Sequence, residues 1–172
     1  MWSNMKIQLA KELSKQDSDL LFHWRERVCP HEGAKLDWSQ PDWHLVASDS
    51  ESVPVAHLGY SGYLVELDGE EEQTVVGVGG VVVRPEYQGQ HIPGLLFEHL
   101  HGSRHALEIS SIFTLFCPFR LERYYRKHGY KSFQGDVSFM QGPVRTRSEN
   151  IRFMHRGSLE GSRTVRLRCE PW

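Results

Sequence analysis

A run of valines broken by a glycine pair constrains the fold of this chain more than any other feature. Residues 75–83 read Val-Val-Gly-Val-Gly-Gly-Val-Val-Val. The β-branched valines favour a strand, whereas Gly79-Gly80 favours a β-bulge or the close approach of a second backbone. The loop 84–90 follows, and the apolar residues between Leu95 and Leu100 have helical spacing. The sequence therefore predicts a bulged strand that leads through a loop into a helix.

Apolar patterns elsewhere predict a mixed α/β sheet with flanking helices. One helix is expected around 20–28, ended by Pro30, and a short charged helix over 120–128, ended by Gly129. The two longest strands form an antiparallel hairpin around the Asp68-Gly69 turn. The strands expected are 5–9, 43–47, 53–67, 72–83, 109–116, 130–133 and 137–141. The resulting order is β-α-β-β-β-α-β-α-β-β.

The length of 172 residues suits one ordinary domain. We expect a single domain over 1–172, with a core of about 5–141 and a loosely attached segment over 142–172. Hydrophobic residues at 39% and charged residues at 24% exclude disordered and low-complexity classes. No apolar run approaches the roughly 20 residues that span a bilayer, and the first residues lack a signal-peptide pattern. We therefore expect a cytoplasmic protein with no membrane contact.

The net charge of −2 gives no bias toward nucleic acid or anionic membranes. Acidic residues cluster within 66–72, and seven arginines lie within 145–168. We expect a solvated hairpin tip and a basic surface tail, and ligand contacts in the tail remain an alternative.

Cysteine and histidine spacing gives no sign of a metal site. The three cysteines, Cys29, Cys117 and Cys169, leave one unpaired in any disulfide scheme, and no C-x-x-C pair occurs. His101 and His105 would share a helix face, but the residues between them lack the glutamate of the H-E-x-x-H pattern. We expect reduced thiols and no bound metal.

The loop before the helix is a candidate anion site. Residues 88–94 lie where a strand leads into a helix N-terminus, whose first backbone N–H groups lack internal partners and carry the positive end of the helix dipole. An ordinary βα turn is the alternative explanation of the same pattern.

These segments resemble the GCN5-related N-acetyltransferase (GNAT) superfamily, whose pyrophosphate motif is Gln/Arg-x-x-Gly-x-Gly/Ala at the start of a helix. Residues 81–90 match its surroundings, whereas His91 and Pro93 replace small residues of the motif. The resemblance implies the GNAT fold, α/β (α+β), a mixed, mostly antiparallel sheet with a β-bulge and flanking helices. It also implies that acetyl-CoA binds at Val81, Val82, Val83, Gln88, Gly89, Gln90, His91, Ile92, Pro93 and Gly94.

A second match lies in 116–130 and resembles the superfamily segment that carries its general acid. Tyr125 takes that position. A phenol with a pKa near ~10 is protonated at neutral pH and can give a proton to the departing thiolate of CoA. In such a fold the bulge separates two strands, the pantetheine arm pairs with the backbone of Val81 and Val83, and a backbone N–H polarises the thioester carbonyl.

A narrower resemblance links the chain to the aminoglycoside 2′-N-acetyltransferases and, more distantly, to the nodulation acyltransferases. It rests on 37–38, 55–57, 142–146 and 170–172, besides the segments above. By position, the acceptor side is formed by Asp37, Glu149, Glu170 and the terminal carboxylate of Trp172. Carboxylates suit a polycationic amino sugar because charged acceptors give protonated amines the stronger hydrogen bonds. Gly79 stands where that family has a glutamate, so the resemblance assigns no general base.

The first hypothesis is therefore an acetyl-CoA-dependent N-acetyltransferase that acts on a small-molecule amine such as an aminoglycoside. Transfer of a longer acyl chain is the second. A degenerate module that binds CoA or a partner through its basic tail is the third. No nucleic-acid partner is expected, and pairing of C-terminal strands across a homodimer remains open.

Overall fold

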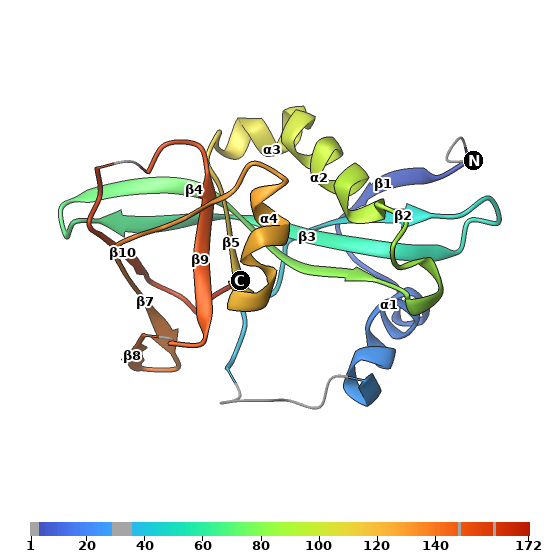
Figure 1. The fold of residues 1–172 in the computed structure, drawn as a ribbon, viewed down its shortest axis with the longest axis horizontal. Coiled ribbons are helices and arrows are strands. Elements are labelled where there is room, and N and C mark those ends of the chain that lie inside the picture. Colours follow the sequence, from blue (N-terminus) through green and yellow to red (C-terminus); the bar gives the residue numbers. More distant parts are fainter. Residues whose placement is uncertain (1–3, 29–35, 148, 160) are drawn as a thin grey trace.

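The computed structural model describes residues 4–28, 36–147, 149–159 and 161–172, and Figure 1 shows their arrangement. Short 3-10 turns cover Pro85–Tyr87 and Phe119–Leu121. The helices are α1 (Lys15–Val28), α2 (Ile92–Gly102), α3 (Arg104–Ile109) and α4 (Glu122–Arg126). The strands are β1 (Lys6–Ala10), β2 (Trp43–Ser48), β3 (Pro54–Leu67), β4 (Glu71–Val83), β5 (Phe113–Pro118), β6 (Lys131–Ser132), β7 (Asp136–Gln141), β8 (Val144–Thr146), β9 (Ile151–Arg156) and β10 (Thr164–Leu167).

The strands form one curled sheet in the order β6-β9-β5-β4-β3-β10-β7-β8, and β2 pairs with both β1 and β3. The long β3–β4 hairpin is its centre. Among the described strands, β4–β5 and β10–β7 pair in parallel, whereas the other ladders are antiparallel. The mixed, mostly antiparallel sheet expected from the sequence is therefore confirmed.

The helices cover both faces of this sheet. Helices α2 and α3 lie on one side and α1 lies on the other (Figure 1). Leu96, Phe97 and Leu100 of α2 pack with strand residues such as Leu58 and Val78 in the larger buried cluster. A second cluster joins the distal hairpin to β7, β9 and β10. The two clusters fix β4, which runs from one to the other.

The structure corrects the sequence prediction after α2. The strand expected over 109–116 begins at Phe113, because 104–109 form α3, whose N-cap Ser103 accepts a hydrogen bond from the Ala106 N–H. Strands β8, β9 and β10 were not predicted. The segment after 141 is thus not loosely attached, since β10 inserts between β3 and β7 and β9 pairs with β5.

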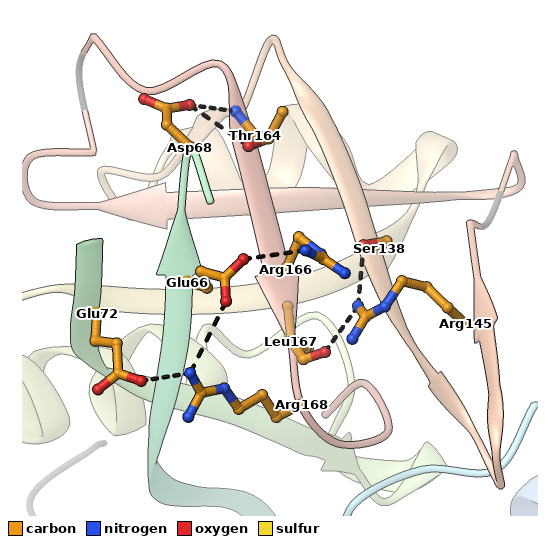
Figure 2. A network of polar contacts seen from close by, with 9 residues as sticks. All are labelled: Glu66, Asp68, Glu72, Ser138, Arg145, Thr164, Arg166, Leu167 and Arg168. Atoms are coloured by element: carbon orange, nitrogen blue, oxygen red, sulfur yellow. Dashed lines mark hydrogen bonds and ion pairs between the residues drawn. The ribbon is translucent and has the colours of Figure 1, made fainter. Parts of the chain in front are cut away.

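The acidic hairpin and the arginine-rich tail pair with each other (Figure 2). Arg166 donates to Glu66 at 3.1 Å, and Arg168 forms ion pairs with Glu66 and Glu72. Asp68 accepts the backbone N–H groups of residues 163 and 164. The tip and the tail are exposed, as expected, but they are not separate solvated clusters. Their partners lie almost one hundred residues apart in the chain, which hid the pairing from sequence inspection.

In the part of the chain that the structure describes, no helix is long and apolar enough to cross a membrane. Cys117 and Cys169 are free thiols, and Cys29 lies outside the described residues.

Candidate active site

The predicted bulge lies in β4 at the glycine pair. His57 of β3 is opposite Val82, but Gly59 is opposite Gly79, so β4 has one extra residue between these two pairs. Gly80 has a φ of +60°, a conformation that costs glycine little and other residues more. The sequence therefore predicted both the position and the residue type of the bulge correctly.

Beside the bulge, β4 loses its neighbour on one edge. The β4–β5 ladder joins Val76–Val78 to Phe113–Leu115, and no pairing of these strands is found beyond Val78 among the described residues. On the other edge, β3 continues to pair with β4 up to Val83. The backbone around Val81 and Val83 can therefore receive an extended ligand as an additional strand on the β5 side.

The end of this edge leads to the N-terminus of α2. Residues 88–90 are exposed, and the Gln88 side chain donates to the Val83 carbonyl oxygen at 3.1 Å. Within the described residues, no backbone hydrogen bond is found for several N–H groups here. They belong to Gly89, Gln90, His91, Ile92 and Gly94. Such a group of donors at a helix N-terminus suits a phosphate or pyrophosphate.

Two residues make this group of backbone donors, called the phosphate cradle below, unusual. His91 is the N-cap of α2 and has left-handed geometry, with φ 56° and ψ 16°. A side chain in this conformation costs about 1–2 kcal/mol relative to glycine, which the related motif has at this place. Pro93 contributes no N–H, although its fixed φ suits the first helical turn. The cradle thus keeps its shape but lacks one donor.

Tyr125 of α4 lies on the same side of the sheet as α2. Its side chain is buried and makes edge contacts with Phe97 and Tyr130. Burial raises the pKa of the Tyr125 phenol above its usual value, and the Arg25 guanidinium of α1 lowers it by a smaller amount. The phenol is therefore protonated at neutral pH and available as a donor.

The last residue of the chain lies against the bulge. Trp172 is buried and stacks on Tyr63, with ring centroids 4.1 Å apart. A Cβ atom on Gly77 would lie 2.6 Å from the Trp172 ring, and one on Gly79 would lie 3.0 Å from the Trp172 carbonyl carbon. Both glycines therefore make room for Trp172, and the main chain of Trp172 occupies the space of a larger side chain at position 79.

The acidic residues expected around the acceptor are only partly brought together. Ser39 binds the carbonyl oxygens of both Glu170 and Pro171 at 2.8 Å, and the Asp37 N–H donates to Gln141. Ser39 therefore lies against the C-terminal residues, whereas the backbone of Asp37 contacts the Gln141 side chain. Glu149 is exposed in the loop before β9, and no contact joins it to this group in the described residues.

Two histidines at the bulge were not among the predicted site residues. His57 is 1% exposed, and its Nδ1 lies 2.7 Å from the Gly80 carbonyl oxygen. Its Nε2 lies 2.8 Å from Nδ1 of His44. Burial lowers the pKa of His57 to about 4, a net value that includes the opposing effect of the hydrogen bond to Gly80 and a smaller lowering by His44. A histidine within an otherwise apolar buried strand was the available sequence signal.

No group of three or more metal-ligating side chains is found among the described residues.

Comparison with known proteins identifies the fold. No family model matches the chain, and no curated protein matches it. A putative N-acetyltransferase from Lactobacillus plantarum is similar in structure, with a TM-score of 0.58, 17% identity and coverage of 89% of this chain and 97% of that one. A GNAT family N-acetyltransferase from Escherichia coli, solved in complex with CoA, gives a TM-score of 0.59 at 18% identity, over 96% and 90% of the two chains.

An acyl-CoA N-acyltransferase from Pseudomonas aeruginosa gives a TM-score of 0.54 at 18% identity and covers 89% of this chain and 99% of its own. The bulged β4, its open edge beside β5 and the N-terminus of α2 are the features that the sequence resemblance predicted. Together with these structural likenesses, they show that the chain has the fold of the GNAT N-acetyltransferases.

Proposed function

We propose that this protein transfers an acetyl group from acetyl-CoA to a primary amine of a small molecule. The observation that carries the proposal is the continuity of two backbone surfaces. The unpaired edge of β4 leads directly to the N–H groups at the start of α2. An extended pantetheine arm fits the first surface, and a pyrophosphate fits the second.

The residues of the site then have distinct tasks. A backbone N–H of the bulge donates to the thioester carbonyl oxygen, and the amine nitrogen attacks the carbonyl carbon. The new C–N bond forms as the C–S bond breaks, and Tyr125 gives its phenol proton to the departing thiolate. The proton released by the amine leaves through the solvent, from which Tyr125 is protonated again. Protons and charges therefore balance over the cycle.

The acceptor that we propose is an amino sugar, with aminoglycosides as the first class to test. In this proposal Asp37, Glu170 and Trp172 supply oxygen atoms for ammonium groups, and the contact of Trp172 with the bulge and of segment 37–39 with Glu170 and Pro171 supports it. Arg166 and Arg168 are engaged by Glu66 and Glu72 of the hairpin, which reduces the repulsion of a cation. Glu149 has the least structural support among the proposed acceptor residues, because no contact joins it to the others in the described residues.

Thiol release from acetyl-CoA in the presence of an aminoglycoside panel tests the function. Asp37→Asn and Glu170→Gln should raise KM for the amine several-fold without changing the KM for acetyl-CoA, because each removes one charged acceptor. Glu51→Gln, at an exposed position outside this group, is the matched control. Equal KM values for all three variants would remove the acidic group from the acceptor site. Replacing acetyl-CoA with longer acyl donors in the same assay separates acetyl transfer from long-chain transfer.

A further inference from the structure

We infer that His57 is a positioning residue that holds the β4 bulge in its reactive geometry, and that His44 fixes the ring state of His57. The inference rests on the proposed acetyl transfer, because it assigns the bulge a part in that reaction. It starts from a chain of two hydrogen bonds, from His44 to His57 and from His57 to the Gly80 carbonyl oxygen.

The chemistry of the partners fixes the direction of both bonds. A carbonyl oxygen only accepts, so Nδ1 of His57 must carry the proton and donate to Gly80. In a neutral ring, Nε2 of His57 is then an acceptor, and Nδ1 of His44 must donate to it. The depressed pKa of His57 agrees with a neutral ring. His44 thereby selects one of the two tautomers of His57.

The surroundings keep the His57 ring in place. Phe22 of α1 packs edge-on against it, with centroids 5.0 Å apart. The Cε1 atom of His57 lies 3.3 Å from the positions that Cβ atoms would take on Gly59 and on Gly80. The ring therefore lies between the two strands at the point where their register shifts, and it fits there because both positions are glycine.

Holding one carbonyl oxygen fixes a whole peptide unit. The Gly80 carbonyl and the Val81 N–H belong to the same planar peptide, and no cis peptide bond is found among the described residues. The two groups thus point in opposite directions, and the Val81 N–H is aimed away from His57. Without His57, a glycine with free access to both signs of φ could let this peptide rotate. The hydrogen bond therefore pre-organises the backbone donors that the reaction needs.

The chain offers a matched control for this role. His155 of β9 is also buried, and its Nδ1 lies 2.8 Å from the carbonyl oxygen of Gly157, another glycine with positive φ. It lies on the far side of β5 from β4, away from the bulge. His57→Leu and His155→Leu therefore remove equivalent hydrogen bonds, but only the first affects the bulge.

The test compares steady-state kinetics of these variants. His57→Leu should lower kcat for acetyl transfer by about tenfold or more and leave KM for acetyl-CoA within about twofold, as expected when a transition-state interaction is lost. His57→Asn, whose side-chain amide replaces the Nδ1 donor, should recover most of kcat, and His44→Phe should lie between the two. His155→Leu should keep wild-type kcat. Equal kcat values for wild type and folded His57→Leu would overturn the inference, and so would failure of His57→Asn to recover activity.

A second readout does not depend on turnover. Nitrogen-15 NMR of the wild type at pH 7 should show His57 as the neutral ring with its proton on Nδ1. His57→Leu, unlike His155→Leu, should shift or broaden the amide signals of Gly80 and Val81. A proton on Nε2 of His57, or unchanged amide signals, would overturn the positioning role even if the enzyme is active. Correct NMR signals in a protein that neither binds nor turns over acetyl-CoA would instead contradict the proposed function, and with it the catalytic part of this inference.

Discussion

The carbonyl carbon of Trp172 lies 3.0 Å from the position that a Cβ atom would take on Gly79. This close approach accounts for the glycine at this position of the bulged strand. A side chain at position 79 would press on the main chain of Trp172, which would have to shift. The chain has glycine there, and Trp172 lies on the bulge in place of a side chain.

Adding a side chain at position 79 should therefore destabilise the protein. We expect Gly79→Glu to lower the free energy of unfolding by about 1–3 kcal/mol, because Trp172 must move from its contact with Tyr63. Urea denaturation measures the change. Gly102→Ala, where a Cβ atom meets nothing within 4 Å, is the control and should be neutral or stabilising. A stable Gly79→Glu variant would show that Trp172 does not need this space.

The stacked ring of Trp172 should itself stabilise the fold. Trp172→Ala should lower the free energy of unfolding by about 3–5 kcal/mol, as for other buried tryptophans. Trp172→Phe retains an aromatic contact with Tyr63 and should lose less. The exposed Trp38, replaced by alanine, should change stability by about 0.5 kcal/mol or less. Similar losses of unfolding free energy for Trp38→Ala and Trp172→Ala would contradict the packing of Trp172 against Tyr63.

Removing one hydroxyl group tests the general acid. Tyr125→Phe should lower kcat by roughly a hundredfold or more, because the phenol no longer protonates the thiolate. The Kd for acetyl-CoA, measured by calorimetry, should stay the same, because the hydroxyl acts in the transfer step and does not bind acetyl-CoA. Tyr124→Phe is the neighbouring control and should keep its activity. An active Tyr125→Phe enzyme would exclude Tyr125 from the mechanism.

The left-handed N-cap of α2 predicts a difference between two substitutions. His91→Gly should be more stable than His91→Ala by about 1 kcal/mol, because alanine keeps the Cβ atom that is unfavourable at φ 56°. Thermal unfolding distinguishes them. Pro93→Ala should lower the Kd for acetyl-CoA because it restores a backbone donor to the cradle. An unchanged Kd would mean that this donor does not face the phosphate.

The buried His57 and the partly buried His101 should make stability depend on pH. Burial lowers the pKa of both His57 and His101 to about 4, from 6.5. Between these values the unfolded chain binds protons that the folded chain excludes, so the free energy of unfolding falls as the pH drops from about 6.5 to about 4. For His57 the loss is on the order of 3 kcal/mol. Urea denaturation across this range measures it, and His57→Asn should flatten the curve. Stability that stays constant over this range would contradict neutral burial of the two rings.

Much of the fold was predictable because local pattern and final structure agree. The valine run with its glycine pair became the bulged β4, and the helix expected near 95–100 became α2. Tyr125 was proposed from its position in a segment that resembles a superfamily motif, and its role stays a prediction. These features depend on residues that are close together in the chain.

The remainder depends on contacts between distant residues. Strand β10 alternates buried Val165 and Leu167 with exposed Arg166. From the sequence alone, its arginines predicted a surface tail, because their acidic partners on the hairpin are distant in the chain. Trp172 could be assigned to the acceptor side only by resemblance, and its contact with Gly79 required the structure. The pairing of His44 with His57 follows from strand register, which no local pattern gives.

The most direct test of the central claim is a calorimetric titration of the purified protein with acetyl-CoA, followed by a thiol-release assay of the same sample with an aminoglycoside panel. We predict micromolar binding and release of CoA that depends on an added amine. Absence of binding would contradict the central claim, because the open edge of β4 and the N–H groups at the start of α2 would then hold no cofactor.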